Sequence, residues 1–142
     1  MKEERMEPAG TRRVLVVANH SVATPDLLDE ISRRSQARAC DFTLLIPDAP
    51  PGAVGEWTLE HAVPLMSRAA GRPVAGLLCR KNDPFHAIQD ALAGGDFDEV
   101  VISTLPRTRS RWLRRSLPRR VERLGVAVSV VTPAGEREPT PA

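Results

Sequence analysis

Five short apolar runs, separated by longer segments with a helical spacing of apolar residues, restrict the fold of this chain more than any other feature. The runs are VLVVA (Val14–Ala18), FTLLI (Phe42–Ile46), VAGLLC (Val74–Cys79), VVIS (Val100–Ser103) and VAVSVV (Val126–Val131). Most of them are continuous rather than alternating, which is typical of strands buried on both faces. The strict alternation predicts an α/β fold, a five-stranded parallel sheet with helices on both faces.

Capping residues mark the starts of three predicted helices. Thr24 and Asp83 are predicted N-caps because each precedes a proline, which fits the first turn of a helix. Ser116 is the predicted cap of a last helix. The side chains expected to face inward are Leu27, Leu28 and Ile31 in the first helix, Phe85, Ile88, Ala91 and Leu92 in the second, and Leu117, Val121 and Leu124 in the last.

The segment from about Trp57 to Ala70 also has helical spacing, but it contains Pro64. Proline inside a helix costs about 3 kcal/mol, because it has no amide hydrogen and its ring clashes with the preceding turn. We therefore expect this helix either to kink or to start later than its pattern suggests.

A length of 142 residues suits one domain. The polar residues 1–11 and the proline-rich residues 133–142 are expected to be disordered tails, which leaves residues 12–132 as the folded domain. No apolar run approaches the roughly 20 residues of a membrane span, and the start of the chain lacks the apolar stretch of a secretory signal. We expect a cytoplasmic protein.

The two cysteines lie in neighbouring predicted strands, Cys40 at the start of one and Cys79 at the end of the next. Parallel strands of this length place them about 20 Å apart, whereas a disulfide needs Cα atoms within about 7 Å. Both are therefore expected to be free thiols.

The common motifs of enzymes are missing. The sequence has no G-x-G-x-x-G, no G-x-x-x-x-G-K-[ST], no G-x-S-x-G, no H-E-x-x-H and no paired C-x-x-C. His20 follows the first strand without a placed partner, and His61 and His86 are expected to face solvent. No catalytic set and no metal site emerges, which favours a binding protein over an enzyme.

The stretch from Asp98 to Val131 contains a strand that ends at Ser103, a polar loop, a helix and the final strand. It resembles the C-terminal third of the universal stress protein family, in which a G-x-x-G-x9-G-[ST] loop wraps nucleotide phosphates. The spacing is kept, but Ser103, Pro106 and Ser116 stand at the three glycine positions. Asn19 stands where the family often has an aspartate. The resemblance extends over roughly Arg13 to Thr132.

This resemblance implies a Rossmann-like strand order, 3-2-1-4-5, with the ligand crevice between strands 1 and 4. The candidate nucleotide-binding residues are then Asn19, Ser103, Thr104, Pro106, Arg107, Ser116 and Leu117. Pro106 offers no amide donor, while the serines and Arg107 can bind phosphate through their side chains. We expect ATP binding to be weak or lost in a domain that serves stress response or regulation. An ATP-binding protein with weak nucleotidase activity is the alternative.

The last apolar run would lie at one edge of such a sheet. A long apolar edge without proline or charge invites pairing with another strand, and the resemblance also implies dimers through this strand. We expect a homodimer that uses Val126, Val128 and Val130.

Between Leu105 and Leu124 stand eight arginines and one acid, Glu122, a net charge of +7 in a chain whose total is +2. A nucleic-acid surface would need interleaved aromatic residues, and only Trp112 is present. A membrane surface would need a long apolar face. The remaining interpretations are a solvated helix face and a surface that docks the domain on a transporter or another partner.

Overall fold

The computed structural model describes residues 11–18, 25–47, 54–79, 83–103 and 116–131. Within these ranges the five strands are β1 (Thr11–Val17), β2 (Ala39–Ile46), β3 (Ala75–Leu78), β4 (Glu99–Ser103) and β5 (Ala127–Val131). The helices of the same ranges are α2 (Pro25–Ala37), α3 (Val54–Ala70), α4 (Pro84–Gly94) and α6 (Leu117–Glu122). Each of the five apolar runs contributes one strand. The first strand begins at Thr11, one residue before the expected start of the domain.

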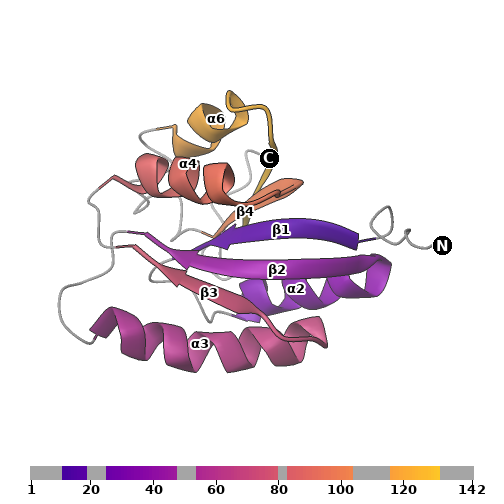
Figure 1. The fold of residues 1–142 in the computed structure, drawn as a ribbon. Coiled ribbons are helices and arrows are strands. Elements are labelled where there is room, and N and C mark those ends of the chain that lie inside the picture. The colour runs from indigo at the N-terminus through magenta and orange to yellow at the C-terminus, as the bar shows by residue number, and fades with distance from the viewer. Residues whose placement is uncertain (1–10, 19–24, 48–53, 80–82, 104–115, 132–142) are drawn as a thin grey trace, which may run out of the picture.

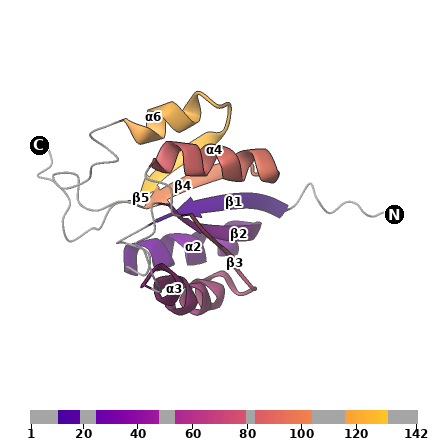
Figure 2. The same cartoon turned by 60° about the vertical axis from the view of Figure 1, so that its left-hand side comes forward.

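All neighbouring strands are parallel, and their order is β3-β2-β1-β4-β5. Helices α2 and α3 lie on one face of the sheet, and α4 and α6 lie on the other (Figures 1 and 2). The predicted α/β fold, a five-stranded parallel sheet with helices on both faces, is therefore confirmed, and so is the strand order that the family resemblance implied.

Side chains alternate between the two faces along each strand. Val14 and Val16 of β1 belong to the core under α2 and α3, together with Leu27 and Ile31 of α2. Leu15 and Val17 belong to the core under α4 and α6. Because both faces of the central strands are buried, the strands read as continuous apolar runs in the sequence.

Two helices start where the sequence predicted. Pro25 is the first residue of α2, and Pro84 is the first residue of α4. The Asp83 carboxylate caps α4 by accepting a hydrogen bond from the amide of Phe85 at 3.0 Å. Ser116 takes the predicted cap position of α6, but its side chain makes no capping hydrogen bond.

Helix α3 begins at Val54 and continues through Pro64 to Ala70. The expectation of a later start is therefore wrong. The helix is held by its inner face, because Ala62, Met66 and Ala70 are buried in the core. Its packing on β3 is close: a Cβ added to Gly76 would lie 3.0 Å from a methyl carbon of Leu59. Tertiary packing of this face offsets the proline's preference against helix.

The outermost strands are less well covered on the face of α4 and α6. Leu77 of β3 and Val130 of β5 are each 42% exposed. Their register partners, Leu45 and Ile102, both belong to the core under α4 and α6. Leu124 is 39% exposed and lies beyond the end of α6, so the expectation that it faces inward is wrong.

Cys40 and Cys79 are free, as expected. In the described ranges, no helix combines the length and the apolar character that a membrane span requires.

Candidate functional site

The strand order reverses direction between β1 and β4. From β1 the chain passes to α2 on one face of the sheet, and from β4 it passes to α6 on the other (Figure 2). The carboxyl ends of these two strands lie together, since Val17 is the register partner of Ile102. In open parallel sheets ligands bind at such a place. The fold therefore puts the candidate site beside Ala18 and Ser103.

Ser103 closes β4 and is buried, with 2% of its surface exposed. Among the candidate nucleotide-binding residues, Ser103, Ser116 and Leu117 are described by the structure. Asn19, Thr104, Pro106 and Arg107 lie outside the described residues, as does His20. The parallel pairing of β1 with β4 brings their described ends together.

Ser116 adopts a left-handed backbone conformation, with φ 58° and ψ 36°. Within the described ranges it is the one residue other than glycine with a positive φ. This conformation costs a residue with a side chain about 1–2 kcal/mol, and glycine adopts it freely. In the alignment that the family resemblance implies, Ser116 would stand at the third glycine position of the phosphate-loop motif. The backbone at this point thus has the geometry of a glycine, although the residue is serine.

Leu117 follows directly, at the position where the motif has serine or threonine. Its side chain is buried in the core under α4 and α6. Leu117 was expected as a candidate nucleotide contact, but its side chain belongs to the core and does not face a ligand.

The described residues offer no catalytic arrangement at this edge of the sheet. Nδ1 of His86 lies 2.6 Å from a carboxylate oxygen of Asp83, but both side chains are exposed to solvent at the start of α4. His61 is also exposed, as expected. Among the described residues there is no group of three metal-ligating side chains.

A second polar cluster, which sequence reasoning missed, lies near the amino ends of the central strands. Glu99, the first residue of β4, is 5% exposed. Its Oε1 accepts hydrogen bonds from Arg34 at 2.7 Å and from Arg12 at 3.1 Å, and its Oε2 accepts one from Ser129 at 2.7 Å. Arg34 also donates to Glu30 at 2.6 Å and to Ser129 at 3.1 Å. We call these residues the Glu99 cluster.

The Glu99 cluster joins helix α2 to strands β1, β4 and β5. Burial by itself would raise the pKa of Glu99, but hydrogen bonds from Arg34, Ser129 and Arg12 outweigh it, so this pKa lies below its ordinary value. Burial also opposes the charge of Arg34, yet the hydrogen bonds to Glu99 and Glu30 raise its pKa. Every charge in the cluster has a partner, and the cluster is structural.

Cys40 lies beside this cluster, and its thiol is within 3.8 Å of the Arg34 carbonyl oxygen. Burial raises the pKa of this thiol, against the opposing effect of the arginines nearby. Cys40 is therefore a protonated, structural cysteine at neutral pH.

The expected dimer residues lie on or next to β5. Val126 and Val128 are partly buried and pack against the core under α4 and α6, whereas Val130 is exposed. Strand β5 pairs with β4 on one side only, so it forms one edge of the sheet. The other edge is β3.

Of the comparisons with known proteins, the one with solved structures supports this architecture. No family model matches the sequence, and no curated protein matches it. Among solved structures, a universal stress protein from Archaeoglobus fulgidus is similar, with a TM-score of 0.60 and 14% sequence identity over 84% of this chain and 93% of that chain. At this identity the likeness shows the fold, which is that of a universal stress protein.

Proposed function

We propose that this chain is a member of the universal stress protein family that acts by binding, in stress response or its regulation. The observation that carries the proposal is the left-handed backbone of Ser116, φ 58°. The family motif has a glycine at this position, and glycine is the residue that favours this conformation. The strand order and the likeness to a universal stress protein structure support the fold that this proposal requires.

In this proposal the nucleotide contacts of the family are weakened. A phosphate loop works through backbone amides that approach the phosphates closely, which glycine permits. Pro106 provides no amide, and Ser103 and Ser116 add side chains where the family has none. Leu117 buries an apolar group at the position of a hydroxyl. One lost charge-assisted hydrogen bond weakens affinity by about 1.5–3 kcal/mol, or roughly ten- to a hundredfold.

Calorimetry of the full chain with ATP and magnesium tests this proposal. We expect a dissociation constant weaker than about 10 μM. A tighter value would contradict it and favour an ATP-binding protein, and turnover of the bound ATP would favour a nucleotidase. Arg107→Ala and Ser116→Ala identify the site if binding is seen, because both variants should weaken it. Tight binding that neither variant changes would place the ligand elsewhere.

We also propose that the protein forms a homodimer through β5. Its exposed edge is apolar, and Val130 is 42% exposed. Charge on an edge strand opposes pairing with another strand. Val130→Lys should therefore give a monomer in sedimentation at micromolar concentration. Leu77→Lys on the opposite edge, where exposure is the same 42%, is the matched control and should stay dimeric. A wild-type monomer, or a dimeric Val130→Lys variant, would contradict the proposal.

A further inference from the structure

Helix α6 and its C-cap carry three arginines, Arg119, Arg120 and Arg123, which we call the arginine surface. Arg119 and Arg123 are exposed and stand one helical turn apart. Like charges at this spacing repel each other by a few tenths of a kcal/mol. Among the described residues neither of them forms an ion pair. Four arginines elsewhere in the described residues do pair with acids, namely Arg12, Arg33, Arg34 and Arg72.

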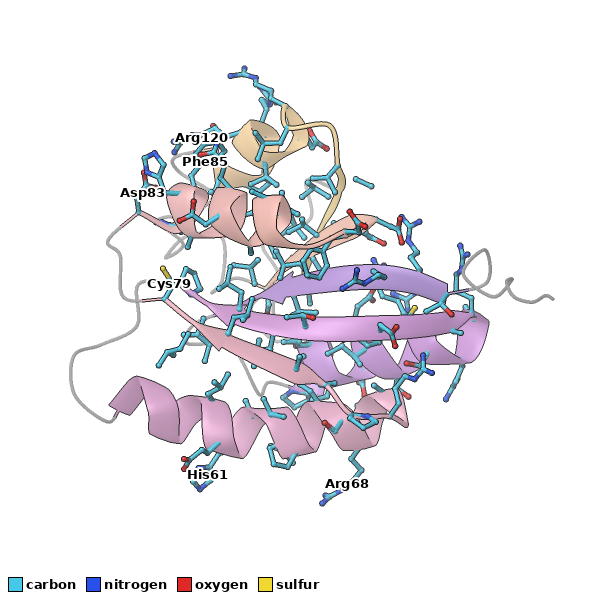
Figure 3. The ribbon with its side chains drawn as sticks, in the orientation of Figure 1. His61, Arg68, Cys79, Asp83, Phe85 and Arg120 are labelled. Carbon is cyan, nitrogen blue, oxygen red and sulfur yellow. The ribbon has the colours of Figure 1, made fainter. Side chains whose placement is uncertain are left out.

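Arg120 is held in place by an aromatic ring of the neighbouring helix. Its guanidinium lies over the Phe85 ring, 4.4 Å from the ring centre, and Figure 3 shows the two side chains together where α6 meets the start of α4. Stacking uses the flat face of the guanidinium and leaves its N–H edges free to donate. Arg120 therefore presents donors in a fixed orientation, which lowers the entropy lost when they bind.

The acid closest in sequence to Phe85 does not neutralise this surface. Asp83 accepts a hydrogen bond from the Phe85 amide at 3.0 Å, and its other carboxylate oxygen lies 2.6 Å from His86. Both of its oxygens are thus engaged at the start of α4. Because no described acid forms an ion pair with Arg119 or Arg123, both guanidinium groups are available to an external anion.

The neighbours of the arginines indicate what kind of anion fits. Glu122 and Leu124 are also exposed in the same short stretch. A phosphate backbone offers no apolar contact for the exposed Leu124. Helix α6 has six residues, too few for the long apolar face of a membrane-surface helix. Arginine beside an apolar residue is typical of protein interfaces.

We propose that the arginine surface docks an acidic segment of a partner protein. This segment carries carboxylates about one helical turn apart, to match Arg119 and Arg123, and an apolar side chain that covers Leu124. Complementary charge steers the encounter and makes it salt-dependent, because exposed charges are screened within about 8 Å at physiological ionic strength. The proposal does not depend on nucleotide binding, so it stands or fails separately from the proposed function.

Amide chemical shifts of the full chain, followed by two-dimensional NMR, test the proposal. The probe is a synthetic helical peptide with glutamates at positions i and i+4 and one leucine on the same face. We expect shifts centred on α6 that disappear at high salt. The double variant Arg119→Gln/Arg123→Gln should bind the peptide at least about tenfold more weakly, a loss of about 1.4 kcal/mol.

Three controls make the result decisive. Arg68→Gln removes an exposed arginine of α3, on the opposite face of the sheet, and should leave the peptide affinity unchanged (Figure 3). The same peptide with glutamine in place of glutamate should not bind. Oligouridylate and vesicles of phosphatidylglycerol should bind more weakly than the acidic peptide. The proposal would be overturned if Arg68→Gln lost as much peptide affinity as the double variant, or if the double variant lost none. Tighter binding of oligouridylate or of the vesicles than of the acidic peptide would also overturn it.

Discussion

The two faces of the sheet are covered in different ways. On one face lie the long helices α2 and α3, of 13 and 17 residues, and α2 is tied to three strands by the Glu99 cluster. On the other face lie α4 and α6, of 11 and 6 residues. Here two arginines lie over aromatic rings. The guanidinium carbon of Arg13 is 5.2 Å from the centre of the Phe97 ring, and that of Arg120 is 4.4 Å from the centre of the Phe85 ring. The second face also leaves Leu77 and Val130 exposed.

This difference separates charge that stabilises the fold from charge that is available for binding. Arg34 lies between α2 and the sheet, and its guanidinium pairs with both Glu30 and Glu99. Arg119 and Arg123 form no ion pair within the part of the chain that the structure describes. A buried arginine without an acid would be strongly destabilising, whereas an exposed one costs little. The face of α2 and α3 therefore serves stability, and the face of α6 can serve recognition.

The largest effect is expected from breaking the Glu99 cluster. Glu99→Gln keeps the shape of the side chain but removes the negative charge between Arg12 and Arg34, and we expect a loss of about 3–5 kcal/mol. The free energy of unfolding in urea measures this loss. Arg33→Gln is the matched control, because it breaks the ion pair between the exposed Arg33 and Glu30. That change should cost less than about 1 kcal/mol, and equal losses would show that the cluster is not structural.

Truncating apolar side chains should reveal the same difference between the two faces. Ile31 of α2 is 1% exposed, so Ile31→Ala leaves a cavity and should cost about 2–5 kcal/mol. Leu77, on the face of α4 and α6, is 42% exposed, and Leu77→Ala should cost clearly less, about 1 kcal/mol. Urea unfolding at one temperature measures both. Similar losses would mean that the two faces are equally well packed.

The Glu99 cluster should also make stability depend on pH. The pKa of Glu99 is lowered below its ordinary value by hydrogen bonds from Arg34, Ser129 and Arg12, which outweigh the opposing effect of burial. Its contribution is therefore fully present above the unfolded-state pKa and is lost as the pH falls through the folded-state pKa. The difference in unfolding free energy between the wild type and Glu99→Gln should be constant near neutral pH and shrink in acid. A difference that grows in acid would contradict this assignment.

Much of the fold could be predicted because the helix-capping residues and the apolar runs indicate the same order of helices and strands. Asp83 and Pro84 mark a helix start that the structure confirms in detail, and the continuous apolar runs identify strands that are buried on both faces. The later start expected from Pro64 is wrong, because the local penalty of proline takes no account of the packing of Ala62 and Met66. Leu124 was misjudged because helical spacing was extended past the last residue of α6.

The polar contacts were harder to predict, because they join residues that are far apart in the sequence. Glu99 and Arg34 are separated by 65 positions, and neither lies in a recognisable motif. Their pairing depends on the strand order and on the face that α2 covers. The candidate site was placed at the carboxyl ends of β1 and β4 by topology alone. The conformation of Ser116 could be suspected from the glycine position of the family motif, but its backbone angles required the structure.

The smallest change in stability is expected from substitutions at the two ends of α6, where the backbone has a positive φ. Helix α6 is the shorter helix on the less well covered face of the sheet. Ser116, before the helix, has φ 58°, and Gly125, after it, has φ 93°. Ser116→Gly relieves the left-handed strain of about 1–2 kcal/mol, while the more flexible unfolded chain offsets about 0.4–1 kcal/mol of this gain. The net result should be a stabilisation of between zero and about 1.6 kcal/mol.

Gly125→Ser is the converse change, and it should have the opposite sign. A Cβ at Gly125 would meet no atom within 4 Å, so the substitution tests backbone conformation without a steric clash. We expect it to destabilise the protein by about 1 kcal/mol, because a residue with a side chain must then adopt a positive φ. Thermal unfolding of both variants beside the wild type measures the two shifts. If Ser116→Gly lowers the stability instead, the serine side chain stabilises the start of α6, and the position is not a replaced glycine.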